Sequence, residues 1–321
     1  MDNLTHTLVG LMLSRAGLNR FHLRASAILI IAVNIPDIDA VSLAGGAGNY
    51  FHYHRGITHA IAFAPVMALL PLLAVRIATR KSIAWLSGYL LALLGVASHL
   101  MLDFTNIYGI RLFLPFSNAW PSLDITGVID PWIWTVLLLA LIGPLISRLV
   151  SSEIGGKSAT GRGGAIFALL FLLIYDSGRW VLHQRAVAVQ EARMYNGETP
   201  RRVAALPSVA NPMQWNGIVE TDSAFFVHSV NLAGDFDPAA GRVFYKTEDT
   251  AAAHAARATN AFEDLTAFAP FLFWQVTPSP DTENAVQVQA ADLRFGTPPR
   301  PRFVATAIVQ GNRVLRSWFR F

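Results

Sequence analysis

The sequence predicts an α-helical membrane domain followed by a small soluble α+β domain. The chain is 53% hydrophobic and only 14% charged, with a mean hydropathy of +0.40, whereas ordinary soluble domains carry about 25% charge. Its long apolar segments all lie before residue 183, and strand-like alternation begins after it. We therefore expect a transmembrane domain over residues 1–183 and a soluble domain over residues 184–321.

Four segments are long enough, or nearly so, to cross a bilayer, which takes about 20 residues. These clear membrane helices are expected at about 57–75, 83–102, 131–147 and 164–182. Two shorter apolar segments come first, at about 4–14 and 25–36. We count them as two short membrane helices, with a tilted or re-entrant hairpin as the alternative.

Basic residues give the expected orientation of these helices. Three loops between apolar segments carry nine of them: Arg15, Arg20, Arg24, Arg76, Arg80, Lys81, Arg148, Lys157 and Arg162. The loops 37–56 and 103–130 carry one each, Arg55 and Arg111. Because cytoplasmic loops are enriched in Lys and Arg, we expect the three basic loops in the cytoplasm. The loops 37–56 and 103–130 and the soluble domain are then extracytoplasmic.

Composition also argues against several classes of protein. The net charge is +4 and the pI about 9.6, but the basic loops account for this balance as a topology signal, so we expect no nucleic-acid partner. The chain has no cysteine, which excludes a disulfide framework and a cysteine-based zinc site. The N-terminus has no basic stretch before an apolar core, so no cleaved signal peptide is expected.

The soluble domain is expected to hold a mainly antiparallel sheet. Strand-like alternation is found at 217–221, 225–230, 242–246, 285–289, 303–309 and 314–321. Gly311-Asn312 between the last two runs predicts a hairpin. An alanine-rich stretch at about 249–268 predicts one helix, with Asp249 as its N-cap.

Side chains of the kinds that bind metals lie at or beside the ends of the apolar segments. They are His6, Asp37, Asp39, His54, His59, His99 and Asp103. Ionisable groups at membrane depth cost about 2.5–3.5 kcal/mol each on insertion scales, so a chain that keeps several of them usually uses them. The predicted topology brings all seven to one membrane face, and the i,i+4 spacing of His99 and Asp103 puts both on one side of a helix. Such a set suits zinc, or Mn²⁺ or Fe²⁺, as one ion or two.

Each of these residues also has a structural alternative. His6 could simply begin a helix, and Asp37 and Asp39 could form a turn after Pro36. His54 and His59 could face lipid headgroups, and His99 with Asp103 could be a hydrogen-bonded pair that locks two helices together. A clustered metal site accounts better for all seven together.

The motifs also resemble a known family. Asp2-Asn-Leu-Thr-His-Thr-Leu-Val-Gly10, Asn34-Ile-Pro-Asp-Ile-Asp39, His54-Arg-Gly-Ile-Thr-His59 and Ser98-His-Leu-Met-Leu-Asp103 resemble the motif set of the YdjM-like membrane-bound metal-dependent hydrolases. The resemblance covers about residues 1–182, and Asn211-Pro-Met-Gln-Trp-Asn216 resembles the extension found in longer members. A more distant similarity to zinc-dependent phospholipase C implies a phosphoester substrate.

The resemblance implies a set of metal ligands. They are His6, Asp37, His59, His99 and Asp103, followed by His54 and Asp39. The family also implies a multi-pass protein of the bacterial inner membrane with a divalent metal, zinc first, as cofactor.

Catalytic roles are expected for Asp39, Arg55, Asp124 and Asp130. Arg55, the single basic residue of its loop, could grip a phosphate bidentately or be an interfacial arginine. Asp124 and Asp130 lie in the loop expected above the cluster and could serve as ligand or general base. Asp130 could also merely start the helix whose first residue is Pro131.

The sequence thus predicts a metal-dependent hydrolase of an ester, first of all a phosphoester, of a membrane-associated substrate such as a lipid or lipid-linked compound. The alternative is a non-enzymatic membrane protein with a structural metal site and an envelope-facing interaction domain. A transport site is disfavoured, because the last two apolar segments have almost no ionisable residue before Asp176.

Overall fold

The computed structural model describes residues 1–154, 160–247 and 249–321, so Lys157 of the third basic loop lies outside the described residues. The chain divides into two compact units. The first, which we call the helical unit, comprises Met1–Asp39, Arg55–Leu182 and Pro207–Pro212. The second, the sheet unit, comprises Ala40–His54, His183–Leu206 and Met213–Phe321.

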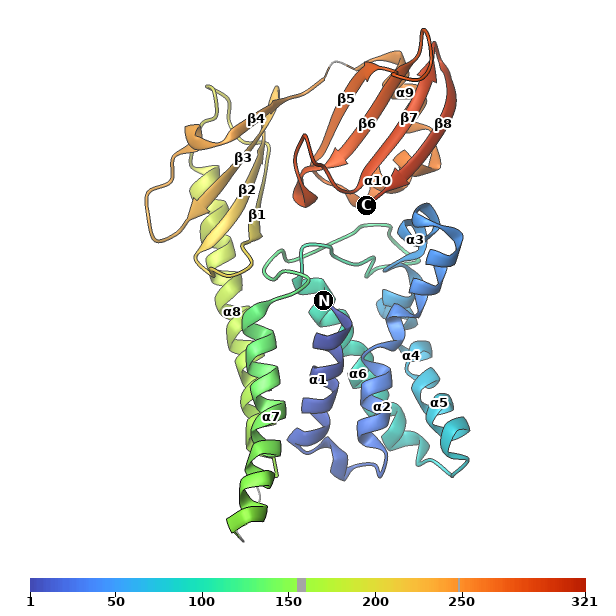
Figure 1. Cartoon of the computed structure of the whole chain (residues 1–321), viewed down its shortest axis with the longest axis vertical. Coiled ribbons are helices and arrows are strands. Elements are labelled where there is room, and N and C mark those ends of the chain that lie inside the picture. The colour runs from blue at the N-terminus through green and yellow to red at the C-terminus, as the bar shows by residue number, and fades with distance from the viewer. Residues whose placement is uncertain (155–159, 248) are drawn as a thin grey trace. The chain divides into compact units, whose positions relative to one another are not determined.

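Helices in a bundle build the helical unit (Figure 1). Its main members are α1 (Asn3–Ala16), α2 (Ala25–Ala32), α5 (Leu69–Thr79), α6 (Trp85–Thr105), α7 (Pro131–Ile154) and α8 (Arg162–Glu191), whose last residues continue into the sheet unit. α1 packs against α2 and α7, and α2 packs against α5 and α6. Two apolar cores result, one among α2, α5 and α6 and one among α1, α7 and α8.

The candidate membrane spans confirm the four clear membrane helices. They are Ile61–Thr79, Trp85–Thr105, Pro131–Val150 and Arg162–Glu191. The two short segments differ from full spans: α1 has 14 residues, while α2 and the 3₁₀ segment η2 (Ile35–Gly45) form a pair bent by 43°. By length and composition the described residues therefore hold four spans, or five if this pair is one broken span.

The first of these spans is not the continuous helix predicted from residue 57. It begins with η3 (Ile57–His59), η4 (Ile61–Phe63) and the four-residue α4 (Ala64–Met67), before α5. Pro65 lies in the first turn of α4, where its missing N–H costs nothing, whereas it could not continue a preceding helix. His59 is therefore held in a short 3₁₀ turn rather than on a long helix.

The sheet unit holds two four-stranded sheets, where the sequence predicted one. Their orders are β1-β2-β3-β4 and β5-β6-β7-β8. The strands are β1 (Arg202–Pro207), β2 (Gln214–Glu220), β3 (Ala224–Asn231), β4 (Arg242–Tyr245), β5 (Leu272–Pro278), β6 (Val286–Asp292), β7 (Val304–Gln310) and β8 (Arg313–Arg320). Every pair from β2 to β4 and from β5 to β8 is antiparallel. This confirms the α+β class and the antiparallel pairing, while β1 and β5 were not predicted.

Turn and cap residues explain two further outcomes. Gly311, at φ +60°, joins β7 to β8, which confirms the predicted hairpin. The single helix predicted at 249–268 is wrong, because the chain forms α9 (Ala251–Arg257) and α10 (Asn260–Phe268). The N-cap of α9 is Thr250, whose side chain accepts the N–H of Ala253, and not Asp249.

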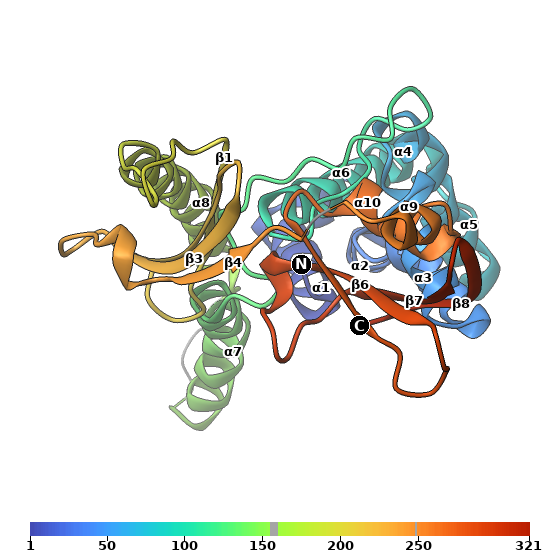
Figure 2. The same ribbon diagram turned by 90° about the horizontal axis from the view of Figure 1, so that it is seen from above.

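Helices cover one face of the second sheet (Figure 2). α9 and α10 pack on β7 and β8, and α3 (Ala47–Tyr53) packs on β8. The Phe51 ring of α3 stacks on Phe319 with centroids 4.2 Å apart and meets Phe268 edge-on at 5.2 Å. The segment 40–54 thus belongs to the sheet unit, although Asp39 and Arg55 on either side of it belong to the helical unit.

Candidate metal centre

Four side chains of the helical unit bring their ligand atoms together. Asp37, His59, His99 and Asp103 each offer one such atom, and all four atoms lie within 4.8 Å of one another. They come from η2, η3 and α6. His59 and His99 are wholly buried, as is Asp103, while the side chain of Asp37 is 13% exposed.

The separations between these atoms fit one tetrahedral ion. Nε2 of His59 lies 3.1 Å from Nε2 of His99 and 3.4 Å from both Asp37 Oδ1 and Asp103 Oδ2. Nε2 of His99 lies 3.4 Å from Asp103 Oδ2 and 3.7 Å from Asp37 Oδ1. Ligands at about 2.1 Å from a tetrahedral zinc ion are about 3.4 Å apart. The five pairs that include a histidine nitrogen therefore have about the spacing that a single ion requires.

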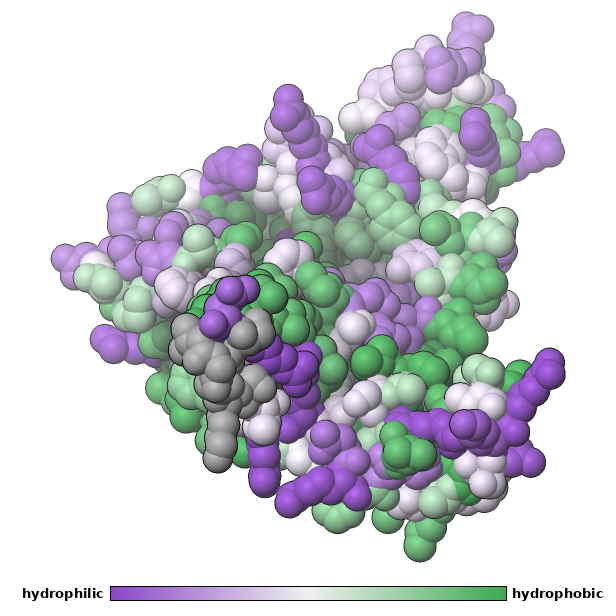
Figure 3. Space-filling model, turned by 60° about the horizontal axis from the view of Figure 1, so that its bottom comes forward, coloured by the Kyte–Doolittle hydropathy of each residue, from purple (hydrophilic) through white to green (hydrophobic). Residues whose placement is uncertain are grey.

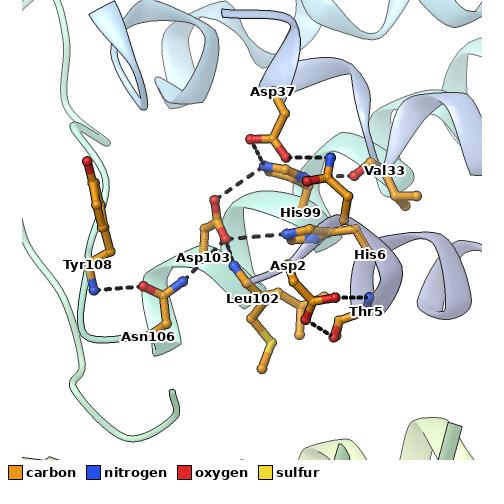
Figure 4. Close-up of polar contacts among 12 residues, drawn as sticks. Asp2, Thr5, His6, Val33, Asp37, His99, Leu102, Asp103, Asn106 and Tyr108 are labelled. Carbon is orange, nitrogen blue, oxygen red and sulfur yellow. Dashed lines mark hydrogen bonds and ion pairs between the residues drawn. The ribbon is translucent and has the colours of Figure 1, made fainter. Parts of the chain in front are cut away.

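The other nitrogen of each histidine is held by an acceptor, so that Nε2 is left for the cluster. Nδ1 of His99 donates to the carbonyl oxygen of Val33 at 2.7 Å (Figure 4). Nδ1 of His59 lies 3.0 Å from Thr58 Oγ1 and 3.4 Å from Asp39 Oδ2. Metal-binding histidines almost always have such a partner, which sets the tautomer and the ring orientation.

His6 lies beside these four residues. It is wholly buried in the second turn of α1, which Asp2 starts by accepting the N–H groups of Leu4 and Thr5. Its Nε2 is 3.3 Å from Asp103 Oδ1, and its ring stacks on His99 at 3.9 Å (Figure 4). Neither ring nitrogen has a hydrogen-bond partner within the described ranges. A buried polar atom without a partner is costly, and a nearby cation or a proton donor would relieve that cost.

The two carboxylate oxygens of Asp103 have different neighbours. Its Oδ2 points to His59 and His99, whereas Oδ1 contacts Arg55 Nη2 at 3.2 Å, Asn106 Nδ2 at 3.3 Å and the amino group of Met1. Positive groups around Oδ1 disfavour a second cation there. The four-atom cluster therefore fits one ion on the Oδ2 side of Asp103.

Arg55 is 4% exposed and is engaged on several sides. Besides Asp103, its Nη1 donates to Asn106 Oδ1 at 3.3 Å and to the carbonyl oxygen of Gly109 at 3.2 Å. Its guanidinium also lies 4.7 Å from the centroid of the Tyr108 ring. These contacts make Arg55 a residue that holds Asp103 in place, and they argue against an interfacial arginine.

Asp39 supports the loop that carries His59. Its Oδ2 accepts the backbone N–H of Arg55 and the hydroxyl of Thr58, both at 2.8 Å. Arg55 has a positive φ of 54°, a conformation that a side chain rarely adopts without support from its surroundings. Asp39 therefore stands behind the cluster rather than among the four nearest atoms.

Three further predicted site residues do not contribute an atom to this four-atom cluster. His54 ends α3 in the sheet unit, and its ring stacks on Tyr50 at 4.4 Å. Asp130 Oδ1 accepts the N–H groups of Trp132 and Ile133, and its Oδ2 accepts the Tyr175 hydroxyl. These contacts make Asp130 the N-cap of α7.

Asp124 is the third of these residues. It has a φ of 53° and accepts the Ser122 hydroxyl at 2.7 Å. The catalytic roles expected of Asp39, Arg55, Asp124 and Asp130 stay predictions.

The sequence interpretation missed several residues that contact the side chains of the metal centre. Asn106 follows Asp103 by three residues, Thr58 adjoins His59, and Asn3 donates to Asp37 Oδ2 at 3.1 Å. Asn3 and Thr58 lie inside the recognised motifs, so the motifs themselves carried this signal. The carbonyl of Val33 carries no sequence signal, because any residue would supply it.

The fold and this cluster define a multi-pass membrane protein with a buried His/Asp centre that could hold a metal ion. Residues 1–186 match the model of the YdjM inner membrane protein family, and the chain belongs to that family. It is also 25% identical, over 99% of its own length and 94% of the relative's, to the uncharacterized protein YfhP of Bacillus subtilis (strain 168). No solved structure matches the chain. The more distant similarity to zinc-dependent phospholipase C stays a prediction.

Proposed function

We propose that this protein is a membrane-bound, metal-dependent hydrolase that cleaves an ester, first of all a phosphoester, of a membrane-associated substrate. The observation that carries the proposal is the spacing of the four ligand atoms of Asp37, His59, His99 and Asp103, at 3.1–3.7 Å for the five pairs that involve a histidine. Neutral imidazoles and carboxylates suit zinc, and also Mn²⁺ or Fe²⁺.

A divalent ion held by these residues would polarise the ester and lower the pKa of a bound water toward about 7. The chain's own residues then have distinct tasks. Asp39 and the carbonyl of Val33 hold the Nδ1 atoms of His59 and His99, so that the two Nε2 atoms could hold the ion. Arg55 holds Asp103 and balances its charge. A site carboxylate takes the proton that the attacking water gives up, with Asp39, Asp124 and Asp130 as the candidates. His6 Nε2 faces Asp103 Oδ1 at 3.3 Å and supports that carboxylate.

The substrate is proposed to approach from the side of Asp37, because this residue alone among the four has an exposed side-chain fraction. A lipid or lipid-linked substrate is favoured by the position of the cluster at the ends of membrane helices. The distant similarity to zinc-dependent phospholipase C supports a phosphoester.

The test is elemental analysis of the purified full-length protein together with a screen of phosphoester and lipid substrates. We expect about one equivalent of metal, and hydrolysis that both a chelator and the His59→Ala/His99→Ala variant abolish. His52→Ala/His254→Ala is the matched control, since both of its histidines are exposed and lie in the sheet unit. A double variant that keeps wild-type metal content and activity would refute the proposal.

A specific observation favours a second candidate function. Structural zinc sites are closed by four protein ligands, while catalytic zinc sites usually keep three and an open position. The cluster offers four protein atoms, so a non-enzymatic membrane protein with a structural metal site is the alternative. Stoichiometric metal without hydrolysis of any tested ester, together with loss of folding in the double variant, would favour this alternative.

We also propose that the soluble domain begins at about residue 184 and lies outside the cytoplasm, facing the envelope. The distribution of basic residues among the loops supports this orientation. A reporter that is active only outside the cytoplasm, fused after Phe321, should be active, and the same reporter fused within the 76–81 loop should be inactive. The opposite result would invert the topology.

A further inference from the structure

A cavity lined by basic residues lies at the far end of α1 and α2, away from the metal centre. Its volume is about 550 Å³, and its walls come from the loop between α1 and α2 and the loop between α5 and α6. The lining residues are Arg20, Phe21, His22, Leu23, Arg24, Lys81, Ser82 and Ala84. No residue of the candidate metal centre lines this cavity.

The charged side chains that line this cavity are all positive. Arg20, Arg24 and Lys81 line it, no carboxylate does, and among the described residues none of the three has a carboxylate partner. Arg24 Nη1 donates to the carbonyl of Ser82 at 3.0 Å, which ties the two loops together, and Arg20 Nε donates to the carbonyl of Gly17 at 3.2 Å. A carbonyl partner fixes the direction of a guanidinium but does not neutralise it, so the cavity attracts anions.

Its rim is apolar and exposed. Phe21 is 63% exposed and Leu23 is 93% exposed, and they alternate with Arg20, His22 and Arg24 along the loop. Figure 3 shows hydrophilic side chains beside exposed apolar ones on this end of the helical unit. Apolar side chains interleaved with Lys and Arg are typical of segments that lie in the headgroup layer of a bilayer.

The position in the chain fits that layer. The cavity adjoins the first residue of the candidate span Trp85–Thr105, and Trp85 is 46% exposed there. Tryptophan is enriched where membrane helices meet the headgroups. A ligand of this cavity would therefore be met at the membrane surface.

We propose that this cavity binds the phosphate of an anionic phospholipid headgroup. Arg20 and Lys81 contact the phosphate oxygens, Arg24 holds the two loops in register, and Phe21 and Leu23 insert among the acyl chains. Guanidinium groups pair well with phosphate oxygens, and basic residues close to anionic lipid contribute attraction that amounts to about fivefold in affinity each. The proposal concerns a lipid that anchors and stabilises the helical unit, and it is independent of the metal centre.

The test is the thermal unfolding midpoint of the full-length protein in detergent, titrated with phosphatidylglycerol. Phosphatidylcholine with the same acyl chains and inorganic phosphate are titrated in parallel. We expect stabilisation by phosphatidylglycerol alone, with an apparent affinity that falls about 25-fold in the Arg20→Gln/Lys81→Gln variant, from about fivefold for each cation. Arg20→Lys, which keeps the charge, should retain most of the affinity.

The matched control is Arg76→Gln/Arg148→Gln. It removes the same number of exposed basic residues from the same predicted membrane side, and neither residue lines the cavity. This control should bind phosphatidylglycerol like the wild type. Equal stabilisation by both lipids, or equal loss in both double variants, would overturn the proposal. Stabilisation by inorganic phosphate alone would assign the cavity to a free phosphate and overturn the lipid assignment.

Discussion

Replacing each carboxylate of the metal cluster in turn should separate metal binding from charge balance. Asp37→Asn and Asp103→Asn both replace a charged carboxylate ligand with a weaker, neutral amide, so both should lose the metal. The two residues differ in what else they do. Asp103 also pairs with the buried Arg55 at 3.2 Å, whereas Asp37 is bonded to the amide of Asn3 at 3.1 Å.

The expected magnitudes follow from these contacts. Two carboxylates whose ligand atoms lie within 4.8 Å repel each other by about 3.5 kcal/mol or more at an effective dielectric constant of about 20. Either variant relieves this repulsion in the metal-free protein. Asp103→Asn additionally leaves the charge of Arg55 buried without its carboxylate, which costs about 3–5 kcal/mol. In the metal-free protein Asp103→Asn should therefore be less stable than Asp37→Asn by about 3–5 kcal/mol.

The assay is elemental analysis of purified protein, followed by unfolding with and without a chelator. Asp264→Asn is the control, since it removes a carboxylate that pairs with the exposed His52 in the sheet unit. Wild type and control should lose stability when the chelator is added, and both cluster variants should not respond. Full metal content in either cluster variant would refute the ligand assignment, and equal metal-free stability of the two would refute the role given to Arg55.

Three further predictions concern the sheet unit. Burial lowers the pKa of His228 to about 4 from its ordinary 6.5. As the pH falls, His228 is therefore protonated in the unfolded chain before it is protonated in the folded chain. The free energy of unfolding should be unaffected above pH 6.5 and should fall by up to about 3 kcal/mol as the pH drops toward 4. His228→Gln should flatten this dependence in urea unfolding followed by tryptophan fluorescence, and an unchanged slope would contradict the prediction. His228 Nε2 is hydrogen-bonded to Gln190 Oε1 at 2.9 Å. Gly217→Ala should destabilise this unit by about 1–3 kcal/mol, because the added Cβ would lie 2.2 Å from Gln190 Oε1 and 2.6 Å from His228 Nε2. Wild-type stability of this variant would show that the Gln190–His228 bond is dispensable. Phe51→Ala removes a buried ring that stacks on Phe319 and should lower the free energy of unfolding by about 3–5 kcal/mol in the same measurement. A loss below about 1 kcal/mol would mean that this contact does not hold α3.

Where one local rule was enough, the sequence predicted the fold well. A bilayer span needs about 20 apolar residues in a row, and the four clear membrane helices follow from that count alone. The hairpin at Gly311 follows from the need for positive φ in a tight turn. The prediction failed where local signals compete. Residues 57–68 are apolar enough for a helix, yet they break into short turns around Pro65. In the alanine-rich stretch, Thr250 rather than Asp249 caps α9.

Helix faces and strand alternation say which side of an element is apolar, but not which other element covers it. The second sheet is an example. The run at 272–278 has little alternation and was not predicted as a strand, but it pairs with β6 along its whole length. The segment 40–54 reads as a loop of the membrane domain, yet Phe51 packs among aromatic rings of the sheet unit. Contacts of this kind join residues more than 200 positions apart, and no periodicity reports them.

The sequence alone determined the membrane class of the protein, its motifs and the residue types available for a metal site. Only the tertiary structure decided which candidates meet. It brings His59, His99, Asp37 and Asp103 to within ligand distance, places His6 beside them, and gives Asp130 the role of a helix cap. It also supplies the Val33 carbonyl and Asp39, which orient the two histidines. The physical reason is that a metal site requires separations of about 3.4 Å between atoms of different elements. Side-chain packing between helices sets those separations, and sequence spacing does not.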